Sequence, residues 1–218
     1  MWITSLLSTV KTPTCIALGN FDGVHRGHQQ VIEPILTDTV IQSAVVEGRS
    51  SHQPSYSTVV TFQPHPREFF TGERRSLLTP LEEKIVVLRS LGVKQLVLLP
   101  FNEAVAKLAP EAFVRSILVE QLQAKQISVG KDFCFGQNRS GTATDLRAIA
   151  TQYEIPVEIV PLHICDGERI SSSAIREALS LGNLERANRL LGRPYQLVGQ
   201  VVHGQQLGRT IGFPTANL

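Results

Sequence analysis

Residues 17–31 read Ala-Leu-Gly-Asn-Phe-Asp-Gly-Val-His-Arg-Gly-His-Gln-Gln-Val, an apolar run that passes through a glycine-rich turn into a helix-like segment. A strand that ends in such a turn points backbone N–H groups and the positive end of a helix dipole at one spot, which suits a phosphate. His25 and His28 share one helix face, so their imidazoles can converge on one anionic group, and Gly27 lets that group come close. The stretch predicts a nucleotide site that stabilises charge on a transferring phosphoryl group.

The turn before the two histidines is predicted to line the same pocket, and its binding residues are Gly19, Asn20, Phe21, Asp22 and Gly23. The alternative interpretation is a pair of surface histidines at the start of an ordinary helix. Asp22 has three open roles, which are to orient a histidine, to hold a metal ion or to cap the turn. We favour the nucleotide pocket because strand, turn and helix occur in the order that a phosphate motif requires.

Short apolar runs rich in β-forming residues alternate with amphipathic stretches, which is typical of an α/β fold with a parallel sheet flanked by helices. The expected strands are residues 14–18, 57–62, 95–99, 126–130 and 156–160. A helix is expected over 80–91, with Thr79 as its N-cap, Pro80 at its first position and Gly92 just beyond its end. A second helix is expected over 110–122, and its inward face is Ala112, Phe113, Ile117 and Leu118.

Three places interrupt this pattern. Pro34 removes a backbone donor from the helix expected after His28, so we expect a kink, or a short first turn followed by a second segment. Residues 47–56 are polar with glycine and proline, and they are expected to form a loop. From Tyr195 the chain turns to a glycine-rich β alternation, so domains are expected over 1–192 and 193–218.

The composition bounds the class of protein. The 218 residues are 42% hydrophobic and 18% charged, as in a globular protein. A net charge of +2 argues against a nucleic-acid or anionic-membrane partner, so any anion binding is local. No apolar run approaches the roughly 18 residues of a membrane span. The three scattered cysteines indicate neither a disulfide framework nor a zinc site, and a cytoplasmic protein is expected.

Residues 170–179 read Ile-Ser-Ser-Ser-Ala-Ile-Arg-Glu-Ala-Leu and predict a second anion site. Ser171 and Ser172 can serve simply as helix N-caps. Arg176, however, is expected in the first turn of the helix, where the dipole opposes its charge. An anion bound at this end would remove the conflict, so Arg176 and the two serines are predicted to clamp a phosphate.

His65 stands between Pro64 and Pro66, which restrain its backbone. It is either an exposed part of a rigid turn or an imidazole positioned at the carboxyl edge of the sheet, where open α/β proteins bind ligands. We favour the second interpretation.

Residues 129–141 follow another expected strand and contain Asp132, Phe133 and Asn138. They form either a packed loop or a binding loop. In a binding loop, Asp132 can hold a ribose or a metal ion, and Phe133 and Phe135 offer flat surfaces to a ring system. Asp132, Phe133 and Asn138 are predicted to bind the ligand.

Together these segments resemble the bacterial bifunctional riboflavin kinase and FMN adenylyltransferase family, also called FAD synthetase. The resemblance rests on the His-x-Gly-His signature within residues 19–28 and on residues 62–66, 129–141 and 170–179. It implies a Rossmann-like nucleotidyltransferase fold followed by the start of a β-barrel. Residues 203–218 are similar to the opening of the family's kinase module, in which Thr215 and Asn217 would serve ATP and magnesium.

The reaction implied by this resemblance transfers AMP from ATP to FMN, giving FAD and pyrophosphate with Mg²⁺. His25 and His28 would hold the α- and β-phosphates, while Arg176 and Ser172 would stabilise the leaving pyrophosphate. The full-length protein would also phosphorylate riboflavin, but the chain ends one residue after Asn217 and lacks the rest of that module. We therefore expect FAD from FMN and nothing from riboflavin alone.

Two alternatives remain at this point. One is another His-x-Gly-His nucleotidyltransferase, such as the type that acts on pantetheine phosphate, and the other is an inactive flavin- or nucleotide-binding fragment. The expected partners are small molecules only, and the oligomeric state is left open.

Overall fold

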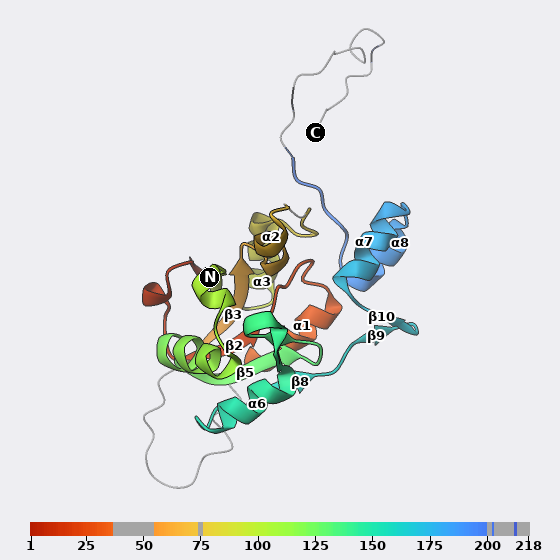
Figure 1. The fold of residues 1–218 in the computed structure, drawn as a ribbon. Helices are drawn as coiled ribbons and strands as arrows, with labels where there is room; N and C mark the ends of the chain where they lie inside the picture. The colour runs from red at the N-terminus through yellow and green to blue at the C-terminus, as the bar shows by residue number, and fades with distance from the viewer. Residues whose placement is uncertain (37–54, 74–75, 200–201, 203–211, 213–218) are drawn as a thin grey trace.

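The computed structural model describes residues 1–36, 55–73, 76–199, 202 and 212. Its centre is a six-stranded sheet in the order β1-β4-β3-β2-β5-β8, and every adjacent pair is parallel (Figure 1). The strands are β1 (Trp2–Thr4), β2 (Thr14–Leu18), β3 (Tyr56–Gln63), β4 (Gln95–Pro100), β5 (Ala124–Gly130) and β8 (Val157–Val160). The predicted α/β fold with a parallel sheet is confirmed.

All five predicted strands exist, and their ends differ from the predicted ends by at most two residues. The sequence interpretation missed β1, which has only three residues at the edge of the sheet and an exposed Trp2. A run this short shows no alternation that could distinguish it from a loop.

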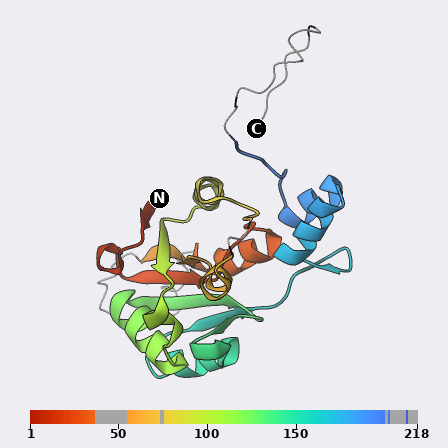
Figure 2. The same cartoon turned by 45° about the horizontal axis from the view of Figure 1, so that its top comes forward.

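The sheet is buried on both faces because successive side chains of a strand point to opposite sides. Ile16 and Leu18 pack with residues of α5, η4 and α6. Ala17, between them, packs on the other face with residues of α1, η2 and α3. Figure 2 shows the strands between these helices, which are α1 (Arg26–Ile32), η2 (Glu33–Ile35), α3 (Leu81–Ser90), α5 (Pro110–Phe113), η4 (Val114–Gln121) and α6 (Ala143–Thr151).

The helix starting near residue 80 differs from its prediction at its first turn. Pro80 is the N-cap of α3 and Leu81 its first residue, so Thr79 does not cap it. Instead the buried Thr79 hydroxyl accepts a hydrogen bond from Arg193 at 3.2 Å. The predicted end is confirmed, because Gly92 follows the helix with a φ of 93° that suits glycine.

The helix predicted over 110–122 exists, but it changes its winding. From Val114 to Gln121 it is a π-helix, and the Leu122 N–H donates to the Ile117 carbonyl at 2.9 Å. Phe113, Ile117 and Leu118 are buried as predicted, whereas Ala112 is only half-buried. The spacing of the apolar residues in the sequence does not distinguish this π-helix from an α-helix.

The interruption predicted at Pro34 is confirmed. The helix α1 ends at Ile32, and Pro34 lies in the following 3₁₀ turn, where the missing backbone donor costs least. The second helical segment beyond residue 36, and most of the loop predicted over 47–56, lie outside the described residues.

A smaller unit lies at one end of the sheet. The strands β9 (Ile164–Cys165) and β10 (Glu168–Arg169) form a hairpin, followed by α7 (Ser172–Ser180) and α8 (Leu184–Leu191), which lie side by side in Figure 1. The two helices share an apolar cluster that includes Ile175 and Leu190. Tyr195 packs on this cluster, and the boundary predicted before residue 193 stays a prediction.

The remaining elements are short. They are η1 (Leu7–Thr9), α2 (Pro66–Thr71), α4 (Glu103–Ala106), β6 (Cys134–Phe135), η5 (Gln137–Arg139) and β7 (Gly141–Thr142). Among the residues that the structure describes, none of the helices has the length and apolar character needed to cross a membrane.

Candidate active site

The strand order reverses at β2, because β3 and β4 lie on one side of it and β5 and β8 on the other. Ligands of open α/β sheets bind at such a reversal, beyond the carboxyl ends of the strands. A cavity of about 880 Å³ opens there, and the segments that follow β2, β3, β4, β5 and β8 line it. Its size fits a large organic ligand.

Most of the predicted site residues line this cavity, although they come from four separate segments. They are Gly19, Asn20, Phe21, Asp22, His25, Gly27, His28, His65, Asp132, Phe133, Asn138, Ser171 and Ser172. Gly23 and Arg176 do not line it. Thr215 and Asn217 lie outside the described residues.

We call residues 19–28 the histidine wall. His25 is the N-cap of α1, and its Nδ1 accepts a hydrogen bond from the His28 N–H at 3.2 Å. The two imidazoles stack, with 3.6 Å between ring centroids and 12° between ring planes. The predicted convergence of the two side chains is therefore present, and it occurs through stacking at the start of the helix.

Both imidazoles are neutral at pH 7. Burial lowers the pKa of His25 to about 4. Burial also lowers the pKa of His28 well below its usual range, and the neighbouring His25 and Lys84 lower it further. Because Nδ1 of His25 accepts a hydrogen bond, its single proton is assigned to Nε2, and the ring is a neutral donor there.

Two glycines of the histidine wall, Gly23 and Gly27, allow different close contacts. A Cβ on Gly27 would approach His25 Nδ1 at 3.3 Å, so this glycine lets the imidazole lie against the helix start. Gly23 has a φ of 93°, and a Cβ there would meet Leu78 at 3.3 Å and Leu191 at 3.6 Å. Gly23 was predicted to bind the ligand; it does not line the cavity, and it lets the turn pack closely against Leu78 and Leu191, while its role in binding stays a prediction.

Asp22 and Arg176 form a pair beneath the turn. Arg176 Nη2 lies 2.7 Å from Asp22 Oδ2, and the same nitrogen donates to the Ser76 carbonyl at 2.6 Å. Asp22 is 4% exposed and also accepts from the Leu78 N–H at 2.9 Å. Asp22 thus orients an arginine and caps a backbone amide.

This pair corrects the prediction for Arg176. The helix α7 begins at Ser172, so Arg176 is its fifth residue and not in the first turn. The Asp22 carboxylate already provides the negative charge that was expected from a bound anion. Arg176 Nη1, however, is buried with no hydrogen-bond partner among the described residues, so one donor of the guanidinium remains unused.

The start of α7 brings two serines to the edge of the cavity. Ser171 is its N-cap and accepts from the Ala174 N–H at 3.1 Å, while the Ser172 hydroxyl donates to the Asp22 carbonyl at 2.8 Å. The capping role that was weighed as the simple alternative is present for Ser171. Ser172 ties this helix to the histidine wall.

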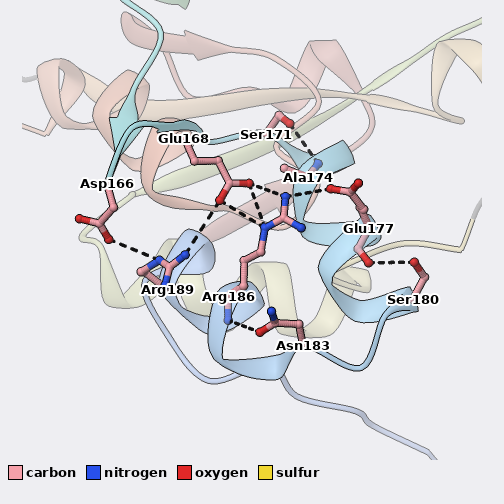
Figure 3. Close-up of polar contacts among 9 residues, drawn as sticks. All are labelled: Asp166, Glu168, Ser171, Ala174, Glu177, Ser180, Asn183, Arg186 and Arg189. Atoms are coloured by element: carbon pink, nitrogen blue, oxygen red, sulfur yellow. Dashed lines mark hydrogen bonds and ion pairs between the residues drawn. The ribbon is translucent and has the colours of Figure 1, made fainter.

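The position of α7 depends on a charged network in the smaller unit (Figure 3). Arg186 of α8 contacts both carboxylate oxygens of Glu168 in the hairpin, with a shortest distance of 2.6 Å, and reaches Glu177 of α7 at 2.8 Å. These hydrogen bonds lower the pKa of Glu168. One arginine therefore joins hairpin, α7 and α8.

Phenylalanine side chains also line the cavity, and we call this group the aromatic wall. It consists of Phe62, Phe70, Phe101, Phe113, Phe133 and Phe135. Phe62 contacts Phe101 edge to face with 5.6 Å between centroids. Of the residues in this wall, only Phe133 and Phe135 were predicted to offer a flat surface to a ligand. The sequence could have indicated Phe62 and Phe101 as ligand-binding residues, because Phe62 lies at the end of a predicted strand and Phe101 directly follows β4.

Three further predicted residues line the cavity. His65 is the N-cap of α2, and its Nδ1 accepts from the Arg67 N–H at 3.0 Å. Asp132 Oδ2 lies 2.7 Å from Arg169 Nη2, so an exposed ion pair joins the loop after β5 to the hairpin. Asn138 has a φ of 54°, a conformation that asparagine tolerates.

A parallel sheet that reverses its order at a turn with two stacked, neutral histidines defines an α/β protein of the nucleotidyltransferase type. The family model described as FAD synthetase matches residues 7–174, and the model described as riboflavin kinase matches residues 191–218. The chain belongs to the FAD synthetase family.

Curated relatives agree with this assignment. The bifunctional riboflavin kinase/FMN adenylyltransferase of Escherichia coli K12 is 39% identical over 214 residues, which are 97% of this chain and 65% of the relative. The protein of the same description from Listeria monocytogenes is 40% identical over 93% of this chain and 61% of its own length. The chain therefore spans less than two thirds of either relative.

A solved structure shows the same fold. It is the crystal structure of a protein described as a macrolide-efflux protein from Streptococcus pneumoniae, with a TM-score of 0.79 and 31% sequence identity. The match covers 99% of this chain and 67% of that protein.

Proposed function

We propose that this chain transfers AMP from ATP to FMN and forms FAD and pyrophosphate. One observation carries the proposal, namely that neutral imidazole donors at a helix N-terminus and several aromatic rings line a single cavity. The imidazoles suit phosphates, and the aromatic rings suit a flat ring system. The family assignment supports the same reaction.

The reaction needs no protein nucleophile. An oxygen of the FMN phosphate attacks the α-phosphorus of ATP, a P–O bond forms, and the bond from that phosphorus to the bridging oxygen of pyrophosphate breaks. Catalysis then consists of positioning and charge stabilisation. His25 and His28 donate hydrogen bonds to the α- and β-phosphates, where negative charge increases in the transition state.

The leaving pyrophosphate lies towards the start of α7. Ser171 and Ser172 border the cavity there, and Arg176 of the same helix has a charged nitrogen, Nη1, with no partner among the described residues. Asp22 keeps the guanidinium in place through the 2.7 Å ion pair. Arg176 thereby assists departure of pyrophosphate although it does not line the cavity.

The flavin ring stacks on the aromatic wall, with Phe62, Phe101 and Phe133 as the main contacts. His65, Asp132 and Asn138 also line the cavity and bind the polar parts of the substrates. An aromatic wall of this size distinguishes FMN from pantetheine phosphate, which has no ring system to stack. This favours the flavin substrate over the other His-x-Gly-His acceptor.

Mg²⁺ enters as the MgATP complex. Within residues 1–36, 55–73 and 76–199, the structure has no cluster of three histidine, cysteine or carboxylate side chains that could hold a metal ion. Magnesium is commonly bound through substrate phosphates, waters and one or two carboxylates, so a protein cage is not required. Asp132 is the exposed carboxylate of the cavity that can reach such a complex.

The test incubates the purified chain with MgATP and FMN and identifies the flavins by chromatography. We expect FAD and an equal amount of pyrophosphate. A separate incubation with riboflavin in place of FMN tests the kinase reaction of the longer relatives. A panel with pantetheine phosphate tests the alternative acceptor. Bound flavin without any FAD formation would refute the proposal and favour a binding fragment.

A further inference from the structure

Lys84 of α3 lies behind the histidine wall and does not line the cavity. Its side chain is buried, with 8% of the residue exposed. Its Nζ donates a hydrogen bond to the Asn20 carbonyl at 3.2 Å. Among the described residues no ion pair within 4.0 Å includes this nitrogen, and burial lowers the pKa of Lys84, while the charge of Asp22 acts on it from farther away and raises its pKa. Such burial is costly and calls for a reason.

The bond to the Asn20 carbonyl fixes one peptide unit of the histidine wall. The Thr61 hydroxyl donates to the same oxygen at 3.0 Å, and Thr61 does not line the cavity either. The carbonyl therefore points away from the cavity. In a planar trans peptide the following N–H points the opposite way, so the Phe21 N–H faces the cavity side of the turn.

The Phe21 N–H is available to a ligand. It donates to no acceptor among the described residues, and Phe21 has a φ of 48°, which turns the backbone sharply at this position. Contacts from outside the turn must stabilise this conformation. The hydrogen bonds from Lys84 and Thr61 to the Asn20 carbonyl provide this stabilisation.

The charge of Lys84 adds to the same effect. Asp22 is the nearest carboxylate in the wall, and Arg176 already pairs with it at 2.7 Å. The two neutral histidines carry no charge, so Lys84 is a surplus positive charge beneath the turn. A cation in a poorly hydrated place acts on its surroundings more strongly than one in water.

We propose that Lys84 is a positioning residue for phosphate binding, which keeps the Phe21 N–H directed at the substrate phosphates and adds positive potential to the histidine wall. The inference rests on the proposed use of this wall for phosphate. The simpler interpretation is that Lys84 only supports the folding of the turn, and the two make different predictions about ligands with and without a phosphate.

The test compares Lys84→Met with Arg89→Met in the whole 218-residue chain. Arg89 is exposed on the same helix, so the control also removes one positive charge from α3. Pyrophosphate is titrated into ¹⁵N-labelled protein while the Phe21 amide signal is followed, and riboflavin binding is measured by fluorescence quenching. Riboflavin serves as the ligand without a phosphate.

We expect Lys84→Met to weaken pyrophosphate binding about tenfold, because a hydrogen bond to a charged group is lost, and to leave riboflavin binding within about twofold. The shift of the Phe21 amide on pyrophosphate addition should largely disappear, and Arg89→Met should behave as the wild type. Unchanged pyrophosphate affinity in folded Lys84→Met, or an equal loss for both ligands, would overturn the proposal.

Lys84→Gln covers the case in which Lys84→Met does not fold. Glutamine keeps a donor for the Asn20 carbonyl and removes the charge, so we expect about threefold weaker pyrophosphate binding with the Phe21 response retained. Unaltered affinity there would reject the contribution of charge. If the wild-type chain bound no pyrophosphate, the proposed function itself would be wrong. If the wild-type chain bound pyrophosphate and Lys84→Met weakened that binding, but no FAD formed, only the proposed adenylyl transfer would be wrong.

Discussion

The histidine wall and the aromatic wall face the same cavity but are built in opposite ways. The first comes from ten consecutive residues, 19–28, and depends on backbone geometry, hydrogen bonds and the buried Lys84 behind it. The second takes single phenylalanines from segments far apart in the chain, which meet because the three parallel strands β3, β4 and β5 end at the same edge. A local turn suits the fixed geometry of a phosphate, whereas stacking tolerates a surface assembled from distant pieces.

The largest effect is expected from His28→Ala in the histidine wall. Removing one preorganised donor typically lowers the rate about a hundredfold or more, so FAD formation should fall by at least that factor. The measurement is the initial rate of FAD formation, with circular dichroism to verify the fold. His163→Ala is the matched control, since His163 lines the same cavity without stacking on a second imidazole. A folded His28→Ala protein within tenfold of the wild-type rate would remove the proposed role.

Arg176→Met tests the link between the histidine wall and the smaller unit. We expect about tenfold weaker ATP binding, as for loss of a charged hydrogen bond, together with lower thermal stability because buried Asp22 loses its partner. Calorimetry gives both quantities.

The double variant Asp22→Asn/Arg176→Met separates the two effects of Arg176. Without either charge, the thermal stability should recover in part while ATP binding stays weak. Recovery of ATP affinity in the double variant would show that Arg176 acts only by balancing Asp22.

A smaller effect is expected from the aromatic wall. Phe101→Ala should weaken FMN binding about fivefold to tenfold, the range of a single stacking contact, and leave ATP binding unchanged. Phe69→Ala is the control, because Phe69 touches Phe101 with 5.4 Å between centroids but does not line the cavity. Equal losses in the two variants would indicate that the phenylalanines support one another and do not contact the flavin.

The last prediction concerns folding stability and pH, and it does not affect the reaction itself. The pKa of His25 is about 4 in the folded protein and near 6.5 when unfolded, so below pH 6.5 the unfolded chain takes up the proton and folding stability falls. For this histidine the slope is at most about 1.4 kcal/mol per pH unit between pH 6.5 and 4. His25→Asn keeps a capping acceptor without a titrating ring, and urea unfolding at several pH values should give a shallower dependence. An unchanged slope would mean that His25 is not the group responsible.

The sequence alone determined the features that depend on neighbours along the chain. The alternation of apolar runs indicates the strands β2 to β5. The spacing of His25 and His28 indicates the turn, and the conformational preference of glycine indicates that α3 ends before Gly92. The motifs within residues 19–28, 62–66, 129–141 and 170–179 are also sufficient to indicate the family, because each is a run of neighbouring residues.

Only the tertiary structure decided how distant residues satisfy one another. The sequence pattern presents Arg176 as an unpaired charge near a helix start, but Asp22, 154 residues earlier, supplies its partner. Lys84 looks like one more charge on an amphipathic helix, yet it is buried against the Asn20 carbonyl. Phe62 and Phe101 become one wall through the register of β3 and β4. Such pairings depend on which surfaces the packed sheet brings into contact, so the pattern of neighbouring residues in the sequence does not indicate them.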